Sequence, residues 1–373
     1  MFPLKKYSIR NYDFSLVTFV IILSAIGVYL VRIAQEGLFL KQIMGLVLGL
    51  FIVAVVSLID YHFISQFYII LYFINLILLV AVKLIGVEHN SSRRWLDLKV
   101  FEFQPSELTK IILIIFMAKL LVIFKDRMKK FYVLVLLGVL IAIPTFLILT
   151  QTNLSTSLVI LFIFAIMIFA GGLSLKIILP ILITVIPLVI GTLWGIQNNY
   201  DIFFLTNYQQ NRIEAFMNPG ADKSSSTLYQ QENSVEVIGS GKLTGKLFSE
   251  GKDAIQSDTY VPISESDFIF SVAGESLGFI GGCVIIVLLS IIIFKCLIIA
   301  SHAPDRLGRL IAIGISAMFV FQMFVNIGVA TKILPNTGIP LPFVSYGLSS
   351  MMSSMIAIGI IININLQRKY RRG

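Results

Sequence analysis

Long apolar segments recur along the whole chain, and their lengths restrict its fold more than any other feature. Most are close to the roughly 20 residues that an α-helix needs to cross the hydrocarbon core of a bilayer. They cover residues 14–31, 38–59, 63–86, 107–124, 131–150, 154–171, 176–197, 267–299, 310–331 and 340–365. Because membrane spans must pair their backbone polar groups internally, we predict an all-α integral membrane protein with ten transmembrane helices, in which residues 1–373 form a single domain. A composition of 57% hydrophobic and 13% charged residues excludes a water-soluble enzyme.

Positive charges are unevenly divided between the two sides of such a bundle. An even number of crossings places both termini on one side, which then holds fourteen Lys and Arg residues against six in the short loops of the other side. Since cytoplasmic loops carry the excess of Lys and Arg, we predict that both termini lie in the cytoplasm. The net charge of +9 is then explained by the cytoplasmic loops of a membrane protein, and we expect no nucleic-acid partner.

Two connections on the predicted outer side are unusually polar, residues 87–106 and residues 198–266. Half of the 20 acidic residues lie between positions 201 and 267. Loops of this length between packed helices are usually functional or disordered. We predict a large extracytoplasmic loop between helices seven and eight, and we favour a functional one because it ends in a patterned stretch. Its glycine-rich run from Gly239 to Lys246 lacks the spacing of a phosphate-binding loop.

Two ionisable residues open the fourth predicted helix. Glu107 and Lys110 are three positions apart, so they share a face and can form an ion pair. One interpretation is a helix cap with its ion pair, because the helix dipole favours an anion in the first turn. The other is a polar site at the outer mouth of the bundle, since ionisable groups within a membrane usually face the bundle interior. Lys295, near the inner end of the eighth helix, is expected to reach toward the interface.

A second polar set lies at the start of the eighth predicted helix. Asp267, Ser271 and Glu275 follow at intervals of four residues and would form one stripe. Ser264 and Ser266 are candidate N-caps. An aspartate at a helix start is usually a cap, whereas Glu275, about 12 Å deeper, is harder to explain in that way.

The segment from Gly338 to Gly347 cannot be a regular helix, because it holds two prolines and two glycines. Irregular backbone at membrane depth is tolerated where it is buried or lines a cavity. Ser345 and Ser349 would supply hydroxyl groups there. On the ninth helix, Asn326 is expected to form interhelical hydrogen bonds.

Several stretches, in order along nearly the whole chain, resemble the SEDS family, which includes RodA, FtsW and SpoVE. The matching stretches are Arg93–Leu98 (RRWLDL), Gln104–Lys110 (QPSELTK), Arg212–Pro219 (RIEAFMNP), Ile238–Gly241 (IGSG), Asp267–Gly281 and Asn326–Gly347. The amino acids of the first two stretches resemble those of RodA more closely than those of FtsW.

The resemblance implies a peptidoglycan glycosyltransferase. Such proteins polymerise lipid II into glycan strands on the outer face of the bacterial cytoplasmic membrane, together with a class B penicillin-binding protein that crosslinks them. For this chain the resemblance implies a RodA-like role in cell elongation and rod shape, beside other membrane proteins of the elongation complex. The alternatives are a septal or spore polymerase like FtsW or SpoVE, a lipid II flippase, and a catalytically weak scaffold.

The family's essential aspartate falls on Asp267. Its cavity residues match Arg94, Trp95, Glu107 and Lys110, and our further candidates for substrate binding are Arg93, Glu275, Ser345 and Ser349. Trp95 would either stack on a sugar or anchor the chain at the interface. Four positions depart from the family pattern: Asn153 replaces an aspartate, Ile263 and Ser276 replace glutamates, and Leu348 replaces a glycine. These departures alter the cavity charge and loop geometry that the resemblance implies.

The lipid diphosphate of lipid II is already a good leaving group, so one general base would suffice. We assign that role to Asp267, which would take the proton of the acceptor's 4-hydroxyl. Cationic groups (Arg93, Arg94 and Lys110) or a divalent cation would stabilise the departing diphosphate. Asp267 would alternatively be a ligand of that cation, Mg²⁺ or Mn²⁺, and no cofactor is certain from the sequence.

Overall fold

The computed structural model describes residues 9–89, 92–97, 99, 102–128, 130–173, 226–251, 254–255 and 261–368, with short stretches between 187 and 217. The described helices and strands, in chain order, are η2 (Ile9–Asn11), α1 (Phe14–Ala34), η3 (Glu36–Leu38), α2 (Phe39–Leu58), α3 (Tyr61–Gln66), α4 (Tyr68–Ile85), β1 (Val87–His89), β2 (Ser92–Asp97), β3 (Glu102–Phe103), α5 (Pro105–Ile123), η4 (Lys125–Arg127), α6 (Phe131–Leu149), α7 (Leu154–Ala170), α10 (Ser226–Ser240), α11 (Lys246–Ser249), α13 (Ile269–Ser301), α14 (Arg306–Ala330) and α15 (Leu348–Leu366).

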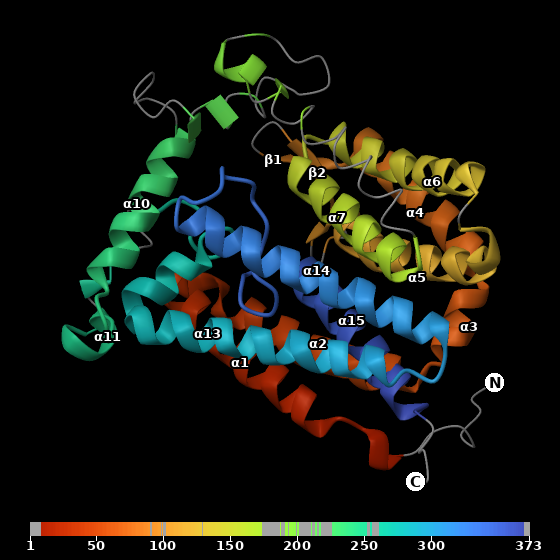
Figure 1. The fold of residues 1–373 in the computed structure, drawn as a ribbon. Helices are drawn as coiled ribbons and strands as arrows, with labels where there is room; N and C mark the ends of the chain where they lie inside the picture. The colour runs from red at the N-terminus through yellow and green to blue at the C-terminus, as the bar shows by residue number, and fades with distance from the viewer. Residues whose placement is uncertain are drawn as a thin grey trace.

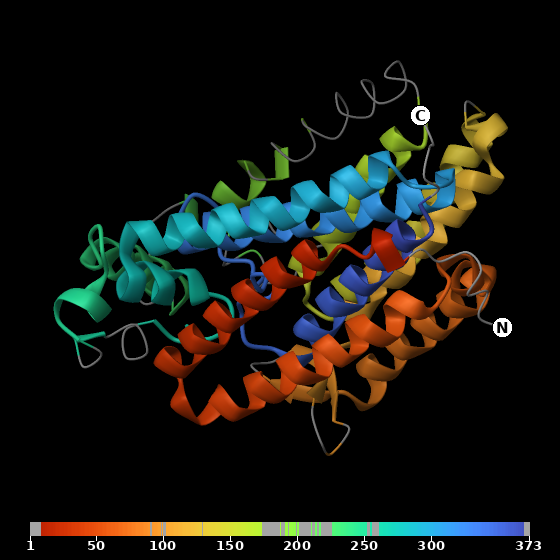
Figure 2. The same ribbon diagram turned by 90° about the horizontal axis from the view of Figure 1, so that it is seen from below.

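Three helices, α5, α14 and α15, form the interior of the bundle (Figure 1). They contact one another, and each is buried along most of its length. Around them, α2 packs on α15, α7 on α14 and α4 on α5. Both α13 and α1 belong to this outer layer, and Figures 1 and 2 show α13 and α14 side by side. Helices α2 and α4 expose large apolar side chains, including Leu40, Phe51 and Ile77, as expected of surfaces that face lipid.

Seven of the described helices are long and apolar enough to cross a membrane: α1, α2 with η3, α4, α6, α13, α14 and α15. The prediction of a multi-pass, predominantly helical chain is therefore confirmed. The interior helix α5 carries three charged residues, Glu107, Lys110 and Lys119, and α7 has only 17 residues. The predicted crossing at 176–197 lies largely outside the described residues, so the count of ten stays a prediction, as does the loop at 198–266.

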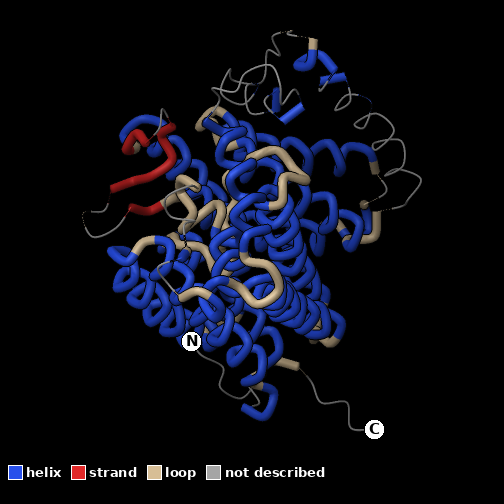
Figure 3. Tube along the Cα trace, turned by 90° about the vertical axis from the view of Figure 1, so that its left-hand side faces the viewer, coloured by secondary structure: helices blue, strands red, loops and turns tan. Residues whose placement is uncertain are grey.

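A small antiparallel sheet forms within the predicted loop 87–106, so the described chain is not purely helical. The strand order is β1-β2-β3, with Val87 opposite Trp95 and Leu96 opposite Phe103 (Figure 3). Strand β2 also contacts α4 and α5. The ladder pairs backbone groups that a loop lying over the bundle would otherwise leave without partners. We refer to this part of the bundle as the sheet end.

The eighth predicted helix begins later than expected. The structure starts α13 at Ile269, so Asp267 lies in the turn before the helix, and the predicted helical stripe does not include it. The predicted N-caps are also wrong: Phe268 holds that position, without a side-chain cap bond. Gly278, with φ of +68°, interrupts α13, so the long segment contains a kink.

The described ends of the chain meet at the opposite end of the bundle. The Asn11 side chain donates to the Arg368 carbonyl (2.9 Å), and Asn365 donates to the Asn11 carbonyl (2.7 Å). We call this part the terminal end. Both described ends therefore lie on one face, as an even number of crossings requires. Lys295 does not simply reach for the interface here, because it forms an ion pair with Asp13 at 3.0 Å.

Candidate active site

The turn that carries Asp267 is held in place by α14. The Asn326 side-chain amide donates to the Asp267 carbonyl (2.9 Å) and also to the Ile339 carbonyl (2.8 Å). Asn326 is buried, whereas Asp267 is half-buried. Asn326 therefore does not bond to another helix as expected, because its two acceptors lie in the turn before α13 and in the irregular segment before α15. The Asp267 carboxylate remains at a partly accessible position on a backbone that the neighbouring helix fixes.

The irregular segment before α15 supports the same turn from a second direction. The Ser345 hydroxyl accepts from the Leu341 amide (2.8 Å) and donates to the Ser266 carbonyl (2.6 Å). The Tyr346 amide donates to the Glu265 carbonyl (2.8 Å). These bonds use the carbonyls that would otherwise begin a helix, which explains why α13 starts two residues after Asp267. The predicted irregular backbone is confirmed, and Ser345 acts in it as a backbone clamp.

Glu265 is a second carboxylate beside Asp267, and the sequence analysis did not single it out. Burial raises the pKa of Glu265, and the negative charge of Asp267 raises it further. Two neighbouring carboxylates with unequal surroundings are a common arrangement in acid–base sites. Their spacing of two residues could have indicated a carboxylate pair. On a helix this spacing would place the two side chains on different faces, so the pair is recognised only once the stretch is known to be a turn.

Glu107 and Lys110 form the predicted ion pair in the first turns of α5. The Lys110 ammonium lies 2.9 and 2.8 Å from the two carboxylate oxygens of Glu107, and both side chains are buried. Ser353 of α15 donates a further hydrogen bond to Glu107 at 3.1 Å. Charges this deep in a bundle are costly unless they are paired and hydrogen-bonded, and here each requirement is met. The pair is consistent with either interpretation made from the sequence.

Three serines link these two regions at intervals of four residues. Ser345 holds the turn before α13, Ser349 holds the start of α5, and Ser353 holds Glu107. The Ser349 hydroxyl accepts from the Gln104 amide (2.9 Å) and donates to the Glu102 carbonyl (3.2 Å). Hydrogen bonds from these serines, at and just before the start of α15, therefore connect the Asp267 turn to the N-terminal end of α5.

Strand β2 places its two arginines differently. Arg94 donates to the Thr152 carbonyl (2.6 Å) and, more weakly, to the Gln151 carbonyl (3.4 Å), which fixes β2 to the turn between α6 and α7. Arg93 is exposed. Trp95 is half-buried in the ladder opposite Val87. Of the three candidates on this strand, Arg93 is the one whose side chain is most accessible.

Glu275 has a cationic partner that the sequence did not reveal. Its carboxylate is fully buried and lies 2.6 Å from the Lys246 ammonium of α11. The turn before α11 rests on the kink of α13, where the Phe279 amide donates to the Lys242 carbonyl (2.9 Å). A Cβ on Gly245 would overlap the backbone of Ser276, so this glycine permits close docking. The glycine run rejected as a phosphate loop is therefore a docking turn.

The departures from the family pattern have local structural explanations in three cases. Asn153 caps α7 by accepting from the Thr156 amide (3.1 Å), and asparagine caps about as well as aspartate. Ser276 donates to the Val272 carbonyl within α13. Leu348 packs over Gly45 of α2. Ile263 is exposed with φ of +61°, and nothing in the structure explains this residue there.

The described part of the chain offers few candidate ligands for a divalent cation. No group of three or more His, Cys, Asp or Glu residues with metal-binding geometry occurs there. Mg²⁺ is commonly held by one or two carboxylates together with substrate phosphates. Glu265 and Asp267 fit that donor set, so the residues present are compatible with a cation that arrives with a diphosphate.

Comparison with known proteins identifies the family. A family model described as the cell cycle protein family of FtsW, RodA and SpoVE matches residues 9–370. A relative from Geobacter sp. (strain M18), named as a probable peptidoglycan glycosyltransferase FtsW, is 32% identical over 97% of this chain and 98% of its own length. The chain belongs to the SEDS family. It is accordingly a glycosyltransferase.

Two solved structures share this SEDS fold. One, described as structural coordination of polymerization and crosslinking by a peptidoglycan synthase complex, has a TM-score of 0.79 at 26% identity and covers 95% of this chain and 97% of that chain. The other, the rod shape determining protein RodA of Thermus thermophilus, has a TM-score of 0.71 at 25% identity and covers 96% and 98%. The predicted SEDS membership is confirmed.

Proposed function

We propose that this SEDS protein polymerises lipid II into glycan strands on the outer face of the bacterial cytoplasmic membrane. The observation that carries the proposal is the family match over residues 9–370, together with a relative named as a peptidoglycan glycosyltransferase. The half-buried Asp267, on a turn fixed by two other elements, supports it, because a general base must be both accessible and held in position.

In this proposal Asp267 removes the proton from the acceptor's 4-hydroxyl as that oxygen attacks the anomeric carbon of the donor. The donor's bond to the lipid diphosphate breaks with inversion, and the diphosphate leaves without needing a proton. Arg93 and Arg94 stabilise the negative charge on the leaving group, with Lys110 oriented by Glu107 as a further cation. Trp95, Glu275 and Ser349 complete the substrate-binding set, Glu275 and Ser349 through the loops that they hold.

A divalent cation would be held by Asp267 and Glu265 if one takes part. When bound, such an ion supplies charge stabilisation to a diphosphate. The two carboxylates would then share the task of orienting it.

We also propose that the chain crosses the membrane ten times, with an outer loop at 198–266 and both termini in the cytoplasm. The positive charges at the terminal end support this orientation. The proposed cellular role is RodA-like elongation with a class B penicillin-binding protein and other membrane proteins of that complex. The solved complex that couples polymerization to crosslinking supports a partner of this kind. The FtsW relative favours the division alternative, and co-purification of the partner distinguishes the two.

The test is gel analysis of glycan product from labelled lipid II with purified protein and its partner. Asp267→Asn is expected to lower the rate by about 100-fold or more, because positioned general bases contribute on that scale. Asp97→Asn, an exposed aspartate in β2, is the matched control and should retain activity. Full activity of a folded Asp267→Asn variant would refute the catalytic role, and transport of lipid II without polymer would support a flippase.

A further inference from the structure

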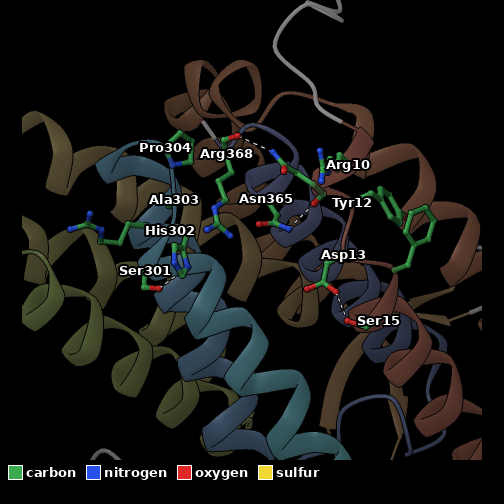
Figure 4. A pocket seen from close by; sticks show the side chains of 13 residues that line it. Arg10, Tyr12, Asp13, Ser15, Ser301, His302, Ala303, Pro304, Asn365 and Arg368 are labelled. Atoms are coloured by element: carbon green, nitrogen blue, oxygen red, sulfur yellow. Dashed lines mark hydrogen bonds between the residues drawn. The ribbon is translucent and has the colours of Figure 1, made fainter. Parts of the chain in front are cut away.

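A pocket of about 1030 Å³ opens at the terminal end of the bundle, away from Asp267. It lies where η2 and the starts of α1 and α14 meet the ends of α13 and α15 (Figure 4). Arg10, Arg309, Arg368 and His302 are among the residues that line it. Neither the proposed chemistry nor the packing of the interior helices uses these cationic side chains.

The pocket is electropositive because its acidic group is already neutralised. Asp13 is the single carboxylate among the described residues that line it. Its oxygens accept from the Lys295 ammonium at 3.0 and 3.1 Å and from the Leu16 amide at 2.9 Å. Burial raises the pKa of Asp13, but the hydrogen bond from the Ser15 hydroxyl (2.7 Å), followed by those from Leu16 and Lys295, holds it below its usual value. Three arginines therefore face the cavity with no competing free carboxylate among the described lining residues.

Two of the arginines are available to a ligand. Arg309 and Arg368 are exposed, and the described part of the chain provides no acceptor for either guanidinium. The backbone of Arg368 is nevertheless fixed, because its carbonyl accepts from Asn11. Figure 4 shows the Arg368 side chain reaching between His302 and Asn365. A guanidinium on a fixed backbone is well suited to bind phosphate oxygens.

The walls of the pocket continue into surface that faces the bilayer. Ser301 lies four and three residues after Leu297 and Ile298, which are exposed apolar residues on the same side of α13. On the other side, Phe14 at the start of α1 lines the pocket and is 67% exposed. A ligand with a phosphate and acyl chains matches both parts, whereas inorganic phosphate matches only the arginines.

We propose that this pocket binds the headgroup phosphate of an anionic phospholipid, with its acyl chains along the exposed face of α13. Arg309 and Arg368 donate to the phosphate, and Ser301 and Asn365 are within the same lining for hydroxyl groups of the headgroup. Basic pockets between transmembrane helices bind anionic headgroups in this way. The site joins the ends of α1, α13, α14 and α15, so the lipid ties the peripheral helices to the interior ones.

The experiment is native mass spectrometry of the full chain in detergent, titrated with phosphatidylglycerol or phosphatidylcholine. Wild type is expected to prefer phosphatidylglycerol. Arg309→Gln with Arg368→Gln should weaken that binding about 30-fold, since each basic residue near an anionic lipid surface contributes about 1 kcal/mol, or about a fivefold factor. The matched control removes two exposed cations elsewhere, Lys125→Gln with Arg127→Gln, and should change binding less than threefold.

Two further arms keep the outcome decisive. Leu297→Gln with Ile298→Gln should weaken lipid binding but leave competition by inorganic phosphate unchanged. Equal losses in the arginine and control variants would overturn the proposal in favour of general surface charge. Competition by inorganic phosphate as strong as that by the lipid would overturn the lipid assignment. If the double arginine variant does not fold, phosphatidylglycerol binding is measured for Arg368→Gln alone, and its affinity is expected to fall about fivefold.

Discussion

The side-chain amide of Asn326 donates to the backbone carbonyl of Asp267 at 2.9 Å, so a residue of the interior helix α14 fixes the turn that presents the proposed general base. The same amide reaches the Ile339 carbonyl, which joins the turn to the irregular segment before α15. Asp267 is therefore positioned by long-range hydrogen bonds and not by the regular geometry of α13.

Asn326→Leu, which keeps the approximate size and removes the donor, should lower lipid II polymerisation about 10- to 100-fold, because small displacements of a catalytic group are costly. Stability should fall by about 1–3 kcal/mol, since the buried Ile339 carbonyl and the partly buried Asp267 carbonyl lose their donor. Gln322→Leu, one turn earlier on α14, is the control for removing a buried amide and should retain the polymerisation rate. An Asn326→Leu protein with wild-type turnover would contradict the positioning role.

The Glu107–Lys110 pair predicts a strongly non-additive mutant cycle. Glu107→Gln leaves Lys110 as a buried cation without its carboxylate and should destabilise the protein by about 3–5 kcal/mol. Adding Lys110→Met should recover most of that loss, because the buried charge is gone. Thermal unfolding of the four proteins in detergent measures the coupling, and additive effects would show that the pair is not energetically linked. In the double variant, polymerisation should stay low even though stability returns.

The sequence predicted helices far better than it predicted the turns that support the site. Membrane spans such as α1, α2 and α6 begin and end within a few residues of their apolar runs, because the bilayer imposes both length and composition on them. The start of α13 was wrong because Ser345 and Asn326, far away in sequence, capture carbonyls just before it. Periodicity describes local geometry and contains no information about such distant partners.

The same limit applies to charges. The Glu107–Lys110 pair was predictable, because both members lie on one helix at a spacing that brings them together. The partner of Glu275 was not, since Lys246 is 29 residues away on a separate short helix. Glycines at 241 and 245 were the available signal for close docking, but they do not specify the surface that they approach.

Lys246→Met should release the docking turn from α13, because Glu275 loses its cationic partner in a fully buried position. Limited proteolysis within residues 246–251 should become about tenfold faster, which corresponds to about 1.4 kcal/mol of opening free energy. Lys242→Met, an exposed lysine in the same turn, is the matched control. Adding Glu275→Gln should restore part of the protection, and unchanged cleavage of Lys246→Met would show that the ion pair does not hold the turn.

A histidine at the terminal end predicts a pH-dependent stability. His62 lies between Asp305 (2.7 Å) and Asp60 (2.8 Å), which join the short helix α3 to the start of α14. The hydrogen bond to Asp305 raises the pKa of His62 against the opposing effect of burial, and Asp60 raises it further. The pKa values of both aspartates are lowered by their hydrogen bonds to His62 and its neighbours. A raised histidine pKa contributes stability that is complete below the unfolded value of about 6.5 and is lost as pH rises through the folded value.

The melting temperature of wild type should therefore exceed that of His62→Gln most clearly near pH 6, and the difference should shrink as pH rises past the folded pKa. Below about pH 4 the difference should shrink again, because the aspartates whose pKa values are lowered become protonated there. His302→Gln removes a histidine exposed at the same end of the bundle, whose ring nitrogen lies against Ser301 and the Ile298 carbonyl, and it serves as the control for the loss of an imidazole. A His62→Gln effect of equal size at pH 6 and pH 9 would mean that His62 acts through packing alone, since only its charge is linked to this pH range.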